Sequence, residues 1–157
     1  MELITCEDLN RWADTVESEA LLPRLIALLI YETAPLSTKI DMPWGSATRL
    51  PGYDGKVACE EETHFVSKGN SVWELGTNKN CKGKADDDYQ KRKSNPLGID
   101  PGECTFYFVT NRVWTKKDDW VHKRISEGYW KDVKAYDATI LSQWLGIAPV
   151  TSRWLAS

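Results

Sequence analysis

Several features that mark common protein classes are missing from this sequence of 157 residues. The four cysteines are far apart and form no CxxC pair, and there are only two histidines. This spacing argues against a structural zinc site, and a chain of this size without an export signal does not indicate a disulfide framework. We therefore expect reduced cysteines and a cytoplasmic protein.

The sequence also lacks signs of a membrane or fibrous protein. No apolar run approaches the roughly 20 residues of a membrane-spanning helix, and the N-terminus lacks the basic and apolar regions of an export signal. There is no internal repeat and no low-complexity segment. The net charge of −3 excludes a chain that is basic throughout, although it allows a local basic patch.

The composition that remains is that of an ordinary globular protein, with 41% hydrophobic and 27% charged residues. The length predicts a single domain over residues 1–157. Residue spacing predicts strands at 39–42, 56–59, 71–77, 105–110 and 131–136, and helices at 7–14, 23–32, 84–94, 116–128 and 138–145. This order predicts a three-layer α/β fold with a mixed β-sheet flanked by helices.

One predicted strand carries a carboxylate in its middle. In the run from Ser71 to Thr77, Glu74 shares a face with Val72 and Gly76, because alternate side chains of a strand point the same way. A buried charge is costly unless it is paired or coordinates a metal. Asp54, in the tight bend PGYDG, lies at the start of the preceding strand, about one hairpin away.

Two acids at strand ends, followed by lysines, suit metal-assisted phosphodiester cleavage. Mg²⁺ prefers oxygen ligands on rigid elements. A bound metal lowers the pKa of water and neutralises phosphate charge, and a nearby lysine can stabilise the developing negative charge. The residues also have plainer interpretations, since Glu74 could pair with a Lys or Arg, Asp54 could stabilise its own turn, and Glu17 and the lysines could be solvated.

Longer blocks of the sequence carry a resemblance. The segments EDLNRWADTVES, LPGYDG, SVWELGTNK, KADDDYQKR, NPLGIDP and DATILSQWL resemble the amino-terminal nuclease domains of bacterial antiphage proteins that join a nuclease to a STAND-type NTPase. Those domains belong to the PD-(D/E)xK, or restriction-endonuclease-like, superfamily. The resemblance covers essentially the whole chain and implies a restriction-endonuclease-like fold. It also implies that NTPase and sensor domains follow in a longer chain.

The resemblance implies a site residue by residue. Asp54 and Glu74 would bind Mg²⁺, or Mn²⁺ in its place, with the Leu75 carbonyl as third ligand. Glu17 matches the position of an additional acid in such nucleases. The family lysine is expected two residues after the second acid, where this chain has Gly76. Lys79 is the nearest replacement, and Lys84 is the second candidate.

The implied substrate is double-stranded DNA, cut with low sequence specificity. Phosphate contacts give most sequence-independent affinity. The candidates for these contacts are Lys79, Lys82, Lys84, Lys91, Arg92 and Arg112. Such a nuclease would endanger its host, which suits an antiviral effector that acts when a homo-oligomer assembles.

Two other functions stay open from the sequence. Gly76, at the position of the expected lysine, is compatible with a catalytically silent nucleic-acid-binding module of the same fold. Trp44 and Trp114, in loop-like contexts, could instead anchor a protein partner, with the acids purely structural.

Overall fold

The computed structural model describes residues 3–45 and 51–157, and within these ranges five strands form one sheet in the order β1-β2-β3-β4-β5. The strands are β1 (Lys39–Asp41), β2 (Gly55–Cys59), β3 (Gly69–Gly76), β4 (Cys104–Thr110) and β5 (Asp132–Tyr136). Strands β1, β2 and β3 are antiparallel neighbours, whereas β3, β4 and β5 run parallel. The predicted mixed sheet is therefore confirmed.

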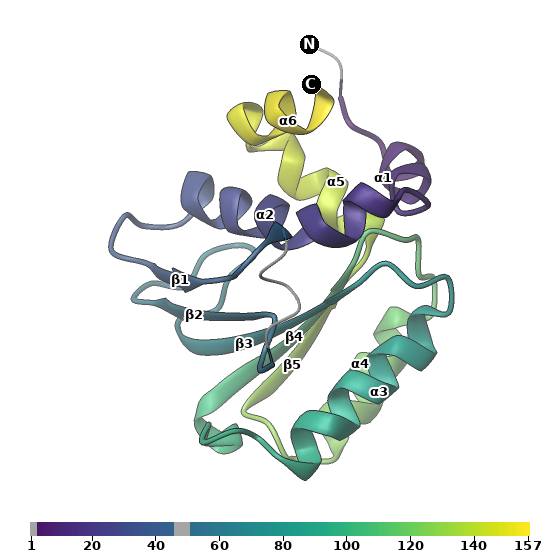
Figure 1. The fold of residues 1–157 in the computed structure, drawn as a ribbon. Coiled ribbons are helices and arrows are strands. Elements are labelled where there is room, and N and C mark those ends of the chain that lie inside the picture. Colours follow the sequence, from purple (N-terminus) through teal and green to yellow (C-terminus); the bar gives the residue numbers. More distant parts are fainter. Residues whose placement is uncertain (1–2, 46–50) are drawn as a thin grey trace.

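Helices cover both faces of this sheet (Figure 1). One face is covered by α1 (Cys6–Trp12), α2 (Val16–Thr33), α5 (Ala138–Gly146) and α6 (Pro149–Ala156), and the other by α3 (Cys81–Ser94) and α4 (Lys117–Ser126). A short 3-10 helix, η2 (Pro101–Glu103), precedes β4. The α/β class with helices on both sides of a mixed sheet agrees with the prediction.

Alternation along the central strands divides the core into two clusters. Trp73 and Leu75 of β3 pack under α2 and α5, whereas Val72 packs against α3 and α4. All seven residues of β4 are buried, which is typical of a strand covered on both faces. Glu74 follows the Val72 alternation, so it points toward the α3 side of the sheet.

The main departure from the predicted elements is the start of α2. The helix begins at Val16, seven residues before Pro23, because the Thr15 side chain accepts a hydrogen bond from the Ser18 N–H and caps it. Pro23 therefore lies inside the helix and has no N–H to donate to the Glu19 carbonyl. The early start brings the first turn of α2 close to the end of β3.

Some side chains lie differently from their predicted positions. Trp114 is buried against Phe108 and Trp120 and is not available as a surface anchor, whereas Trp44 is 47% exposed. Ile125 of α4 is exposed, although it shares one side of the predicted helix with the buried Trp120. Part of the predicted loop before Pro51, residues 46–50, lies outside the described ranges.

Within those ranges no helix is long and apolar enough to cross a membrane.

Candidate metal centre

The β2–β3 hairpin brings the two predicted acids together. Gly55 pairs with Trp73 across the antiparallel strands, so that Asp54 and Glu74 are the next opposed positions. Asp54 Oδ2 accepts a hydrogen bond of 2.8 Å from the Leu75 backbone N–H. This bond fixes the Asp54 carboxylate at the end of β3.

Glu74 is a deeply buried carboxylate, with only 2% of its surface exposed. Its Oε1 accepts a hydrogen bond of 2.5 Å from Arg92 Nε. The alternative interpretation of Glu74, an acid that pairs with a Lys or Arg, is therefore confirmed. The pairing engages one oxygen of Glu74 and does not separate it from Asp54.

A third acid, which the sequence did not single out, comes from α3. Lys84, Asp88 and Arg92 are spaced four residues apart, so they lie along one face of this helix. Lys84 Nζ lies 3.1 Å from Asp88 Oδ1. The face of α3 nearest the acids thus carries a positive, a negative and a positive side chain in succession.

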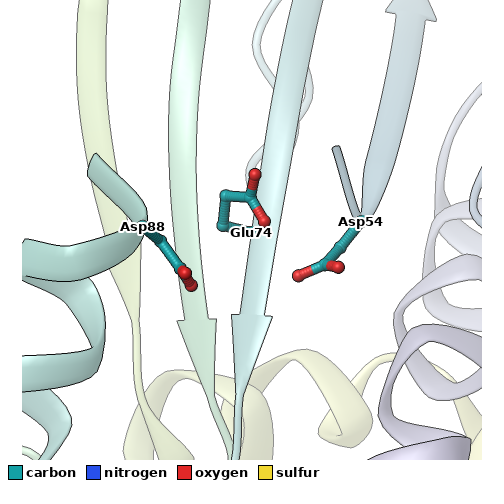
Figure 2. Close-up of side chains that lie close together, drawn as sticks. All are labelled: Asp54, Glu74 and Asp88. Carbon is teal, nitrogen blue, oxygen red and sulfur yellow. The ribbon is translucent and has the colours of Figure 1, made fainter. Parts of the chain in front are cut away.

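The three carboxylates converge (Figure 2). One oxygen atom each of Asp54, Glu74 and Asp88 lies within 4.8 Å of the other two. Asp88 Oδ2 is buried and has no hydrogen-bond partner among the described residues. A buried polar atom normally has a partner, and a hard divalent cation is the partner that carboxylate oxygens fit. The residues therefore fit a Mg²⁺ or Mn²⁺ ion.

Burial and nearby negative charge shift the pKa values of two of the acids, Glu74 and Asp88. Burial, with the nearby Asp54 charge, raises the pKa of Glu74 to about 9 despite the opposing pull of Arg92. Burial also raises the pKa of Asp88, against the pull of Lys84. For Lys84, burial opposes the charged form, but Asp88 and the other two acids outweigh it and raise the pKa of the amine. The cluster thus favours an added positive charge, from a proton or a cation.

A testable consequence concerns stability without metal. The folded-state pKa of Glu74, about 9, lies above its ordinary value of 4.5, so the folded protein binds more protons than the unfolded chain between these values. The free energy of unfolding should then fall as pH rises through this window. One pKa unit is worth about 1.4 kcal/mol, and 1 kcal/mol moves Tm by about 2–4 °C in a domain of this size.

Thermal melts in EDTA at pH 5 to 9 measure this effect. Between pH 5 and pH 9 the Tm of wild type should fall by at least about 3 °C more than the Tm of Glu74→Gln, which has no ionisable group at that position. Equal slopes for the two proteins would contradict the assigned ionisation.

Asp54 lines an open cavity of about 820 Å³ at the C-terminal end of β3. Its lining comes from the first half of α2, the segment between β1 and β2, the end of β3 with the residues after it, and α3: Val16, Glu19, Ala20, Leu22, Pro23, Gly45, Asp54, Leu75, Gly76, Thr77, Asn78 and Lys84. A smaller cavity of about 490 Å³ lies along β1 and β2, but it contains none of the three acids. The larger cavity is therefore the one that reaches the acid cluster, through Asp54.

Of the two candidate lysines, Lys84 is the one that lines this cavity. A Cβ built on Gly76 would lie 2.8 Å from Lys84 Cγ, so the lysine stem occupies the space beside the glycine. Lys79 is exposed and is not part of the lining. Gly76 therefore leaves room for an amine that arrives from α3.

The other two predicted site residues have different outcomes. Glu17 is exposed in the first turn of α2, and Glu19 is the acid of that turn that lines the cavity. The Leu75 N–H is directed at Asp54. Because the N–H and C=O of one strand residue face the same neighbouring strand, the Leu75 carbonyl is directed to the same side.

The predicted DNA contacts divide into exposed and buried groups. Lys79, Lys82 and Lys91 are exposed, with Lys82 paired to Asp86. Arg92 and Arg112 are buried. The Arg112 guanidinium bonds to Asp14 and to the backbone carbonyls of Ala13 and Thr77. Both arginines are committed to contacts within the protein, which removes them from the set that can meet a phosphate.

Asp88 could have been found by a closer look at the helix pattern. Ala85 and Tyr89, four residues apart, are fully buried and mark the inward face of α3. Asp88 and Arg92 lie beside this face, where unpaired charges would not be tolerated. Charged residues next to the buried face of a helix therefore indicate a pair or a site.

Comparison of the chain with protein-family models, curated proteins and solved structures gave no match. The chemistry of the site must therefore be judged from its own residues. These are three converging carboxylates, one lysine amine and an open cavity beside them.

Proposed function

We propose that this chain is a metal-dependent DNA endonuclease domain. The observation that supports the proposal is the convergence of Asp54, Glu74 and Asp88, of which Asp54 lines the same cavity as Lys84. Two of these acids and the adjoining sequence blocks also carry the resemblance to PD-(D/E)xK effector nucleases. The restriction-endonuclease-like identity of the fold belongs to this proposal, as does a role in antiphage defence.

The three carboxylates and the Leu75 carbonyl would hold a Mg²⁺ or Mn²⁺ ion. When bound, such an ion lowers the pKa of water and neutralises charge on a phosphodiester. Lys84 places an ammonium group in the same cavity, where it can donate hydrogen bonds to the negative charge that develops on the phosphate. Asp88 holds this ammonium in place through their ion pair.

The substrate in this proposal is double-stranded DNA. Lys79, Lys82 and Lys91 are exposed on or just before α3, the helix that carries Asp88 and Lys84. Lysine ammonium groups contact phosphates without reading bases, so binding should weaken as salt increases and should show little sequence preference. Association of several copies during activity is part of the same proposal.

Nicking of supercoiled plasmid by the full-length protein tests the function. We expect conversion to open-circular and linear DNA with Mg²⁺ or Mn²⁺ and none after EDTA treatment, because the acids alone cannot neutralise a phosphate. Retardation of the DNA in a gel without cleavage under either condition would favour the silent nucleic-acid-binding module instead. Cleavage that persists in EDTA would contradict a metal-dependent mechanism.

A further inference from the structure

Arg92 joins the two segments that carry the predicted acids. Its Nε donates to Glu74 Oε1 on β3, and its Nη2 donates to the Gly52 carbonyl, each at 2.5 Å. The guanidinium carbon lies 4.7 Å from the centre of the Tyr53 ring. Gly52 and Tyr53 directly precede Asp54, so one side chain contacts both the strand of one acid and the turn of the other.

These contacts determine how the acids face each other. Arg92 engages Oε1 of Glu74, and one oxygen of the same carboxylate lies within 4.8 Å of an oxygen of Asp54 and of Asp88. The turn before Asp54 is held from the same guanidinium, and the Tyr53 hydroxyl donates to the Pro96 carbonyl at 3.0 Å. One guanidinium thus links the strand that carries Glu74 to the turn that precedes Asp54.

We propose that Arg92 is a positioning residue that sets the relative placement of Asp54 and Glu74 for a divalent cation. The inference rests on the proposed metal site and adds a role for a residue that touches neither substrate nor cation. Hydrogen-bonding partners of metal ligands commonly control metal affinity by 10–100-fold. The role needs the planar guanidinium, since a lysine cannot donate to two divergent acceptors in the same fixed geometry.

Arg92→Lys separates positioning from charge, because it keeps the positive charge and removes the two-point bridge. Arg124→Lys is the matched control. Arg124 is also a largely buried arginine over a tyrosine ring, with its Cζ 4.3 Å from the centre of Tyr89, and it bonds to Asp86 and Glu127. Both substitutions remove a largely buried guanidinium group, but of the two arginines only Arg92 contacts an acid of the proposed site.

Calorimetric titration with Mn²⁺ alone, on the full-length protein, gives the readout. We expect Arg92→Lys to bind Mn²⁺ about 10–100-fold more weakly than wild type. The Mn²⁺ affinity of Arg124→Lys should stay within about twofold of wild type, because Arg124 contacts none of the three acids, although its Tm falls. The affinity difference between the variants is a result that a merely structural role for Arg92 does not produce.

The outcomes distinguish the inference from the proposed site. If wild type binds Mn²⁺ and Arg92→Lys binds it within about twofold of wild type, the positioning role is overturned and the metal site remains. If wild type does not bind Mn²⁺, the proposed metal site and the positioning role of Arg92 are both contradicted. If Arg92→Lys does not fold, Tyr53→Leu decides. Loss of the ring below the guanidinium should weaken Mn²⁺ binding about fivefold, and unchanged affinity overturns the inference.

Discussion

Asp54→Asn should reduce DNA cleavage by about a thousandfold or more while the protein stays folded. Loss of a charged metal ligand removes several kcal/mol of transition-state stabilisation, and about 4 kcal/mol corresponds to this factor in rate. The asparagine oxygen can still accept the Leu75 N–H. Without metal the variant should be at least as stable as wild type, because a charge that raises the pKa of Glu74 is gone.

Plasmid cleavage and thermal melting, measured on the same preparations, check this prediction. Asp87→Asn is the control, since Asp87 is exposed on α3 beside Asp88 and changes the net charge equally. It should cut at the wild-type rate. Undiminished cleavage by Asp54→Asn would rule out the proposed site, and equal losses in both variants would indicate a general charge effect.

Lys84→Met should lower kcat by about 100–1000-fold, the usual effect of removing one donor that stabilises transition-state charge. Methionine keeps an apolar stem beside Gly76, so the packing there is preserved while the ammonium group is lost. Mn²⁺ affinity should not fall, because the substitution removes a positive charge near the acids. Single-turnover cleavage with saturating DNA separates this effect from substrate binding.

Lys79→Met provides the comparison. Lys79 is exposed and outside the cavity lining, so its loss should weaken DNA binding modestly and leave kcat close to wild type. If Lys79→Met were inactive and Lys84→Met active, the catalytic amine would be that of Lys79, which is nearer to Glu74 in the sequence. The assignment from the cavity would then be wrong.

The sequence predicted the hairpin of the site better than it predicted the helix that completes it. Glu74 interrupts an apolar strand and Asp54 begins the preceding one, so strand alternation and antiparallel pairing were enough to bring them together. Asp88 belongs to a run of three aspartates in a helix rich in charge. The spacing of Ala85 and Tyr89 singles out Asp88 among the three, but the burial of that helix face follows from the packing of α3 on the sheet.

The same dependence on tertiary packing explains why the sequence favoured Lys79 over Lys84. A local cap explains the start of α2. Lys79 is closer to Glu74 along the chain, but Lys84 comes back over Gly76 because α3 turns toward the sheet. For α2, Pro23 suggested a first turn, while the Thr15 cap set the actual start. Arg92 was predicted at the surface, because a sequence does not show that a basic residue has a buried acid to pair with.

Binding of Mn²⁺ to wild type and to Asp88→Asn tests the central claim most directly. Asp88 is the acid identified from the structure, and its Oδ2 atom has no partner among the described residues. Calorimetry should show one Mn²⁺ site in wild type that is lost in Asp88→Asn and retained in Asp87→Asn. Equal Mn²⁺ binding by all three proteins, or none by wild type, would contradict a metal centre formed by Asp54, Glu74 and Asp88.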